Sequence, residues 1–136
     1  MASRSDLRGL QARAAEVEAA HSALSKAAGN PDAVDRFHRA LNSFYDAAHE
    51  ESVEALKRGE QWAAEYAVDF LVADPRCYRS GYEKELMCRY LGRVEISESQ
   101  RDRLLPVARH AAGDPLRPQR ERKRWNLLVE RLAADG

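Results

Sequence analysis

The sequence has no long apolar run and few cysteines, and each absence excludes a class of protein. No stretch approaches the ~20 consecutive apolar residues of a membrane span, so we expect no membrane partner. The first residues, MASRSDLRGLQ, lack the apolar core of a secretory signal. The two cysteines, Cys77 and Cys88, are too few for a zinc site and are expected to be reduced thiols. We therefore expect a cytoplasmic protein.

Signals for β-strands are equally scarce. No run of β-branched and aromatic residues alternates with period two, whereas apolar residues recur every three or four positions almost throughout. A chain of 136 residues, 44% of them hydrophobic, can bury one core without disulfides or metal. The sequence therefore predicts a single all-α domain over residues 1–136, with about six helices.

Two long helices are predicted in the first half. Between them, Gly29 suits a left-handed C-terminal cap, Asn30 can cap the next helix, and Pro31 suits its first position. Gly59 ends the second helix. Because the turn is short, we expect residues 1–59 to form a long antiparallel hairpin. The predicted helices span residues 5–28 and 31–58.

Four shorter helices are predicted in the second half. Two of them open with a capping box, in which a serine side chain bonds a first-turn amide while the residue three positions later reaches back. The two pairs are Ser80 with Glu83 and Ser97 with Gln100. The predicted helices span residues 60–73, 80–91, 97–112 and 118–134.

Both tryptophans are expected to lie in the core. Trp62 shares an apolar stripe with Tyr66 and Phe70, and Trp125 shares one with Leu128. Stripes at this spacing face a neighbouring helix, so we expect both indole rings to be buried.

Residues 60–135 resemble HEAT-like (armadillo-type) helical repeats. Residues 104–107 (LLPV) lie in a first helix, residues 113–115 (GDP) form a turn, and a basic second helix ends in residues 128–132 (LVERL). An earlier unit ends its first helix in another Asp-Pro pair, residues 74–75, roughly forty residues before the next. The resemblance implies two stacked hairpins with the N-terminal hairpin packed on them. It also implies a binding surface or scaffold, since such repeats are rarely catalytic in themselves.

The two halves of the chain differ in charge, although the formal net charge is zero. Residues 1–75 carry 8 Lys/Arg and 13 Asp/Glu, and residues 76–136 carry 14 and 9. Such a chain can orient an encounter with a charged partner or with a second copy of itself. We therefore expect a non-enzymatic interaction module that binds an acidic protein or peptide through its basic half. The expected partner-binding residues are Arg79, Tyr82, Arg89, Arg120, Arg122, Lys123 and Arg124.

Tyrosines lie close to two of these arginines. If the hairpins stack, Tyr78, Tyr82 and Tyr90 can line a groove together with Arg79 and Arg89, because a concave surface lies between stacked repeats. The alternative is that the tyrosines pack their rings on the core and turn their hydroxyls to solvent. The sequence leaves both interpretations open.

A nucleic-acid-binding protein is the first alternative function. Residues 117–125 (RPQRERKRW) hold five basic side chains and one acidic one. Clustered Arg and Lys contact phosphates, and Trp125 can stack on an unpaired base. The same pattern describes the solvated face of an amphipathic helix whose tryptophan lies in the core. In the alternative, the Arg-rich helix over residues 117–124 contacts the nucleic acid.

A ferritin-like metal-binding bundle is the second alternative. Three acid-x-x-His pairs place a carboxylate and an imidazole on one helix face, as in the di-iron centres of such bundles. However, Asp46 and His49 are predicted on the polar face, and only Glu65 and Asp69, both on one helix, can supply bridging carboxylates. We expect no metal ligand and no cofactor. The three pairs are Glu18 with His21, Asp35 with His38, and Asp46 with His49.

Catalytic signatures are absent from the sequence. It has no glycine-rich phosphate loop, no Gly-x-Ser-x-Gly elbow and no His-Glu-x-x-His. Cys88 can in principle meet His110, but it lies beside an apolar stripe, which is typical of inert packing. We therefore expect no catalytic residue.

Overall fold

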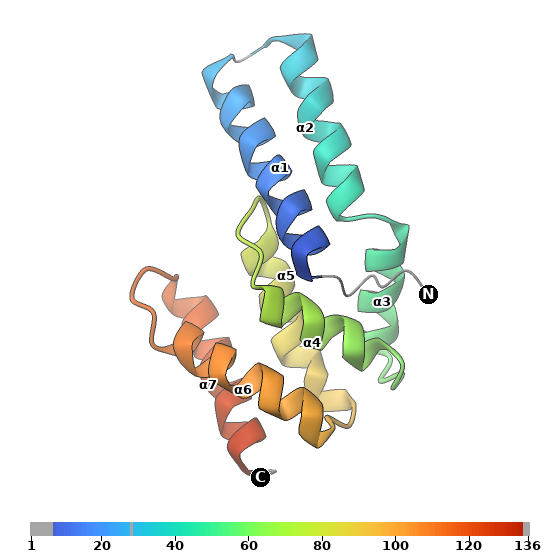
Figure 1. The fold of residues 1–136 in the computed structure, drawn as a ribbon, viewed down its shortest axis with the longest axis vertical. Helices are drawn as coiled ribbons and strands as arrows, with labels where there is room; N and C mark the ends of the chain where they lie inside the picture. The colour runs from blue at the N-terminus through green and yellow to red at the C-terminus, as the bar shows by residue number, and fades with distance from the viewer. Residues whose placement is uncertain (1–6, 28, 135–136) are drawn as a thin grey trace.

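The computed structural model describes residues 7–27 and 29–134, and this part of the chain is all-α, as predicted (Figure 1). Seven α-helices and one short 3-10 turn lie within the described ranges, which contain no strand. None of these helices has both the length and the apolar character that a bilayer crossing requires. The elements are α1 (Leu7–Lys26), α2 (Pro31–Phe44), α3 (Ala47–Lys57), α4 (Ala63–Ala73), α5 (Ser80–Tyr90), the 3-10 turn (Leu91–Arg93), α6 (Glu98–Ala112) and α7 (Gln119–Ala134).

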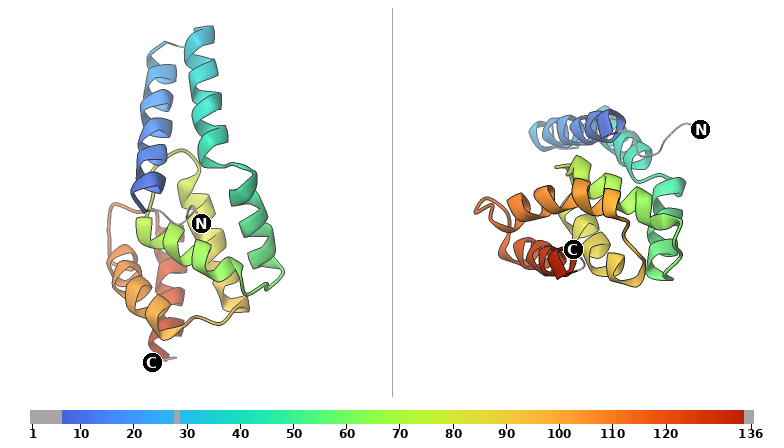
Figure 2. Two further views of the ribbon diagram at one scale, coloured as in Figure 1. Left: turned by 45° about the vertical axis from the view of Figure 1, so that its right-hand side comes forward. Right: turned by 60° about the horizontal axis from the view of Figure 1, so that its bottom comes forward.

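Helix α4 lies at the centre of the molecule, in contact with α1, α3, α5 and α6 (Figure 1). The α1–α2 hairpin projects from one side of it, with the start of α1 near α4 and the turn between the two helices far from the other helices (Figure 2). On the opposite side, α6 and α7 pack against each other, and α7 also packs against α5. Helix α5 therefore has α3 as one neighbour and α7 as another.

The apolar core follows from the spacing of the apolar residues, which recur three and four positions apart along each helix. Trp125, Phe44 and Phe70 are the largest fully buried side chains of the described residues. Burying an aromatic or aliphatic side chain of this kind stabilises the fold by about 1.5–3 kcal/mol relative to leaving it exposed. The α1–α2 seam is thinner because it contains several alanines; its buried members are Leu10, Ala14, Val17, Ala20, Phe37, Ala40 and Phe44.

The single long helix predicted over residues 31–58 is wrong, because the chain turns in the middle of it. Helix α2 ends at Phe44 and α3 begins at Ala47. The Asp46 carboxylate accepts a hydrogen bond from the backbone N–H of His49 at 2.8 Å, which caps a new helix. The turn allows α3 to pack on α4 and α5. Tertiary packing therefore outweighs a local pattern that is compatible with one continuous helix.

Most of the predicted helix ends are confirmed. Gly29 and Gly59 have φ angles of +84° and +78°, which side chains other than that of glycine rarely permit. The Asn30 side chain accepts hydrogen bonds from two backbone N–H groups at the start of α2. Ser97 and Gln100 form the predicted capping box at the start of α6.

The capping box predicted at Ser80 does not form. Helix α5 begins one residue earlier than that box requires, and its N-cap is Arg79, with a φ of +66°. The Ser80 hydroxyl instead accepts from the Cys77 backbone N–H at 3.0 Å. The Glu83 carboxylate contacts His49 on α3 rather than reaching back along its own helix.

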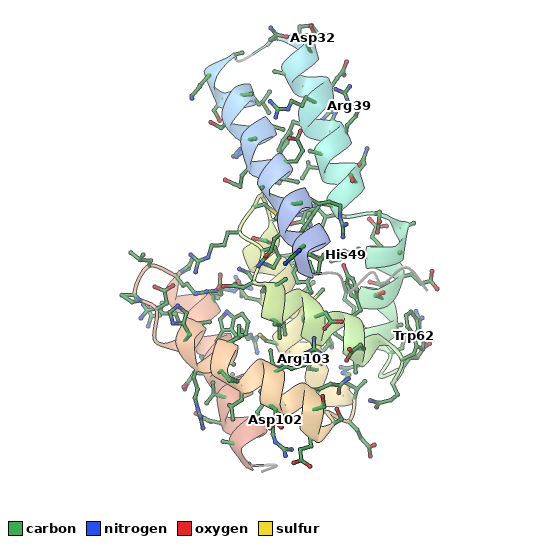
Figure 3. The ribbon with its side chains drawn as sticks, viewed as in Figure 1. Asp32, Arg39, His49, Trp62, Asp102 and Arg103 are labelled. Atoms are coloured by element: carbon green, nitrogen blue, oxygen red, sulfur yellow. The ribbon has the colours of Figure 1, made fainter. Side chains whose placement is uncertain are left out.

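The two tryptophans differ in burial, so one of the two predictions is wrong. Trp125 is fully buried, as expected. Trp62 is 54% exposed, and its indole N–H donates to Glu60 at 2.9 Å (Figure 3). The reason is that α4 begins at Ala63, so Trp62 stands before the first turn of the helix and does not extend its core-facing stripe.

Candidate functional site

A shallow groove runs between α5 and α7. At one end it encloses about 40 Å³ and at the other about 200 Å³. Arg89 and Arg124 line both parts and join them into one feature, which we call the α5–α7 groove. Tyr82, 51% exposed, and Leu127, 46% exposed, contribute ring and aliphatic surface to it. The other lining residues are Glu85, Leu86, Cys88, Gly92, Arg120, Leu128 and Arg131.

Helical spacing explains why the basic residues gather there. On α7, residues four and three positions apart share a face, so Arg120, Arg124 and Leu127 follow one another along the groove. A neighbouring stripe of the same helix, which includes Trp125 and Leu132, holds α7 against the core. Helix α7 therefore supplies both the buried side chains that hold it in place and the basic side chains of the groove.

The structure brings together four of the seven predicted partner-binding residues. Tyr82, Arg89, Arg120 and Arg124 all line the α5–α7 groove. Arg79 lies apart from this groove and lines a recess that also has Tyr82 in its wall.

The remaining two predicted residues, Arg122 and Lys123, line no part of the groove. The Arg122 guanidinium donates to the backbone carbonyl of Arg117 at 3.1 Å and is partly buried. Lys123 is exposed to solvent on α7. Arg122 is therefore held against the segment that precedes α7, and only Lys123 belongs to the solvated surface of the helix.

Few of the arginines that line the α5–α7 groove are neutralised by acidic side chains. Arg120 forms an ion pair with Glu85, with 2.7 Å between Nε and Oε1. Arg89 lies over the Tyr90 ring, 5.3 Å from its centroid. Within the described residues, neither Arg89 nor Arg124 takes part in a recorded ion pair. The groove therefore presents uncompensated positive charge.

The first arginine of the basic segment has a structural role that the sequence did not indicate. Arg117 is 5% exposed and donates to Asp74 and to Glu121, in each case at 2.9 Å from Nη1. Lys84, 3% exposed, also donates to Asp74 at 2.9 Å. Breaking a buried pair of this kind costs about 3–5 kcal/mol, because the remaining charge is left without a partner. This network positions the start of α7 against α5.

Trp125 belongs to the same network of buried polar contacts. Its indole N–H donates to Glu121 at 3.0 Å, and the Arg117 guanidinium lies 5.8 Å from its ring centroid. Since the ring is fully buried, it presents no face on which an unpaired base can stack. One of the two features that favoured nucleic acid is therefore absent from the surface.

A second polar cluster lies between α3, α4 and α5, around His49. This residue was predicted on the polar face of a long helix, and that prediction is wrong: His49 is 1% exposed. Its Nδ1 lies 2.5 Å from the Tyr66 hydroxyl, and its Nε2 lies 2.6 Å from Glu83 Oε1. Because a carboxylate only accepts, Nε2 carries the hydrogen. The sequence signal that was missed is Asp46, which caps the start of a separate helix, α3, and this helix places His49 in the core.

The other histidines of the acid-x-x-His pairs do not join this cluster. His21 lies between the rings of Phe37 and Tyr78, 5.3 Å from each centroid. His38 is exposed on α2. Over residues 7–27 and 29–134, no three His, Cys, Asp or Glu side chains lie close enough together to hold one ion.

Neither thiol has the surroundings of a nucleophile. Burial raises the pKa of Cys77 to about 11, although hydrogen bonds involving Tyr45 and Ser80 act in the opposite direction. Burial also raises the pKa of Cys88, which is 8% exposed. His110, the residue considered as its base, is exposed on α6. A thiol reacts as its thiolate, so both cysteines are held in the unreactive form near neutral pH.

Fold and groove together define an all-α helical protein with a basic surface groove. No protein-family model, curated protein or solved structure matches the chain.

Proposed function

We propose that the chain is a non-enzymatic interaction module that binds an acidic segment of a protein or peptide along the α5–α7 groove. The observation that supports this most directly is the pair of uncompensated cations, Arg89 and Arg124, beside the exposed ring of Tyr82 and the exposed side chain of Leu127. Arginine and tyrosine are enriched at protein interfaces, and charge complementarity selects the partner and speeds the encounter.

The groove also has the rigidity that a binding surface needs. Both of its walls are helices, and α7 is held by Trp125 and by the buried network of Arg117. Side chains on packed helices are already close to their bound arrangement, which reduces the entropy lost on binding.

The resemblance to HEAT-like repeats agrees with this proposal. The two units correspond to the pair α4–α5 and the pair α6–α7, and the proposed groove lies between the second helices of these pairs. We further propose that the module acts in the cytoplasm, where the unpaired thiols Cys77 and Cys88 remain reduced. A second copy of the chain, through its acidic first half, is one partner of the required chemistry.

Fluorescence anisotropy with a labelled acidic peptide tests the proposal. The probe is a 16-residue peptide of Glu and Leu, titrated with the protein at two salt concentrations, and light scattering at the same concentrations measures self-association. We expect the double variant Arg89→Glu/Arg124→Glu to bind at least about tenfold more weakly, since each 1.4 kcal/mol is a factor of ten. Wild-type affinity is expected to fall as salt rises.

Arg109→Glu is the matched control, because Arg109 is an exposed arginine of α6 outside the groove. It makes the same change of charge as either single groove variant, Arg89→Glu or Arg124→Glu, and is expected to leave most of the affinity intact. Equal losses in the control and in the groove variant contradict the proposal. Preferential binding of a single-stranded oligonucleotide of equal charge also contradicts it and favours the nucleic-acid alternative.

A further inference from the structure

A recess of about 460 Å³ lies between α3 and α5, on the other side of Tyr82 and Leu86 from the α5–α7 groove. Its size is in the range of small-molecule sites. We call it the α3–α5 recess; its lining residues are Tyr45, Glu50, Val53, Glu54, Lys57, Arg79, Tyr82, Glu83 and Leu86.

Glu83 is the most deeply placed charge in this recess. Its side chain is 12% exposed, whereas those of Lys57 and Glu54 are 36% and 59% exposed. The carboxylate is held by one oxygen, Oε1, through the hydrogen bond from His49 Nε2 at 2.6 Å. For Oε2 no hydrogen bond is recorded with any described residue. One carboxylate oxygen is thus fixed in place while the other remains available to a ligand.

The support beneath Glu83 is itself buried and hydrogen-bonded. His49 is 1% exposed, and its second ring nitrogen contacts the Tyr66 hydroxyl at 2.5 Å. Both ring nitrogens of His49 therefore have hydrogen-bond partners, which holds the imidazole in place beneath Glu83. A residue whose orientation is fixed by a second layer of hydrogen bonds is a feature of pre-organised binding sites.

The remaining lining suits an organic cation. Tyr45 and Tyr82 supply aromatic surface and Val53 and Leu86 supply aliphatic surface, which favour the stem and the charge of such a ligand. Of the two cations at the rim, Lys57 is paired with Glu54 at 3.1 Å, and the Arg79 guanidinium lies over the Tyr82 ring, 5.8 Å from its centroid. Negative charge therefore dominates in the interior of the recess.

We propose that the α3–α5 recess binds a compact organic cation, an ammonium or guanidinium group on a short apolar stem, with Glu83 as its counter-ion. Two sources share this chemistry: a free amine or guanidine, and a lysine or arginine side chain of a protein partner. The site is independent of the proposed acidic-peptide groove, because the two share only Tyr82 and Leu86 and attract opposite charges.

NMR titration of the isotope-labelled protein tests this site. The probes are benzylamine and butylguanidine for a free cation, N-acetyl-arginine amide for a side chain on a peptide backbone, and benzyl alcohol as the neutral analogue. We expect saturable shifts at the methyl groups of Val53 and Leu86 with the cations and at least tenfold weaker binding of benzyl alcohol. Preference for N-acetyl-arginine amide identifies a partner's side chain as the source, and preference for the small cations identifies a free ligand.

Glu83→Gln is the informative variant, because the amide oxygen still accepts from His49 while the charge is removed. We expect cation binding to weaken about tenfold or more. The matched control, Glu85→Gln, changes an acid of the same helix that lines the other groove and is expected to have little effect. Tyr82→Ala removes exposed aromatic surface and is expected to weaken binding with the fold intact.

Three outcomes overturn the proposal. They are the absence of saturable shifts up to 20 mM of either cation, equal binding of benzyl alcohol, and unchanged affinity in Glu83→Gln. An Arg79→Ala variant that binds cations no less tightly than wild type agrees with the proposal, whereas a site for an acidic ligand loses affinity with that variant. None of these results depends on whether the α5–α7 groove binds an acidic peptide.

Discussion

The guanidinium of Arg117 binds both carboxylate oxygens of Asp74, at 2.9 Å and 2.5 Å, across 43 positions of sequence. Asp74 is the C-terminal cap of α4 and has a φ of +49°, and Arg117 lies two residues before the start of α7. Lys84 of α5 donates to the same carboxylate at 2.9 Å. This one acidic side chain therefore connects the end of α4 with α5 and with the start of α7, the two helices that form the groove.

The first prediction concerns acid stability. Burial acts to raise the pKa of Asp74, but hydrogen bonds and charge attraction from Arg117 and Lys84 outweigh it, so the pKa is lowered. A lowered folded-state pKa contributes stability that is present above the unfolded value of about 3.9 and is lost as pH falls through the folded value. We expect Asp74→Asn to cost roughly 3 kcal/mol at pH 7 and to flatten the stability loss below about pH 4.

Chemical denaturation at a series of pH values from 7 to 2 measures both effects. Asp102→Asn is the control, since Asp102 is an exposed carboxylate of α6 (Figure 3). A pH profile of Asp74→Asn that runs parallel to that of wild type contradicts the prediction.

The second prediction concerns the buried contact of Tyr66 with His49. Tyr66→Phe retains the ring and removes the hydroxyl, which leaves His49 Nδ1 buried without this partner. We expect the variant to lose about 1–3 kcal/mol in the free energy of unfolding. Tyr82→Phe makes the same chemical change at a ring that is 51% exposed, and it is expected to stay within about 0.5 kcal/mol of wild type. Urea denaturation measures the free energy of unfolding of both variants. Equal losses in Tyr66→Phe and Tyr82→Phe contradict a buried contact between Tyr66 and His49.

The third prediction separates the two tryptophans. Trp125→Ala removes a fully buried ring and is expected to cost about 3–5 kcal/mol, whereas Trp62→Ala is expected to stay within about 0.5 kcal/mol of wild type. Acrylamide quenching of the single-tryptophan variants Trp62→Phe and Trp125→Phe gives an independent measurement. The fluorescence that remains in Trp125→Phe is expected to be quenched readily and that in Trp62→Phe poorly; the reverse order would place Trp62 in the core.

The fourth prediction concerns thiol reactivity. Burial raises the pKa of Cys77 to about 11 and also raises that of Cys88. At pH 8, we expect iodoacetamide to alkylate the folded protein roughly two orders of magnitude more slowly than a free cysteine, since only the thiolate reacts. Mass spectrometry of native and urea-denatured samples measures the two rates. Rapid modification of the native protein at Cys77 contradicts the raised pKa.

Much of the fold was predictable because it depends on neighbours within about one helical turn. The apolar spacing, the positive-φ glycines Gly29 and Gly59, and the Ser97 capping box each act through residues three to five positions apart. The clustering of Arg120 and Arg124 on one face of α7 has the same origin, and it accounts for the part of the groove that was predicted.

The sequence by itself therefore determined the all-α class, most helix ends and the basic face of α7. Only the tertiary structure decided that Asp46 begins a new helix, that Trp62 faces solvent, and that His49 meets Glu83 at a separation of 34 positions. The physical reason is that burying a polar side chain such as that of His49 costs free energy unless it is hydrogen-bonded, and the partners of His49 come from other helices. Which helix supplies that partner depends on the packing of the whole chain, so no local sequence pattern predicts it.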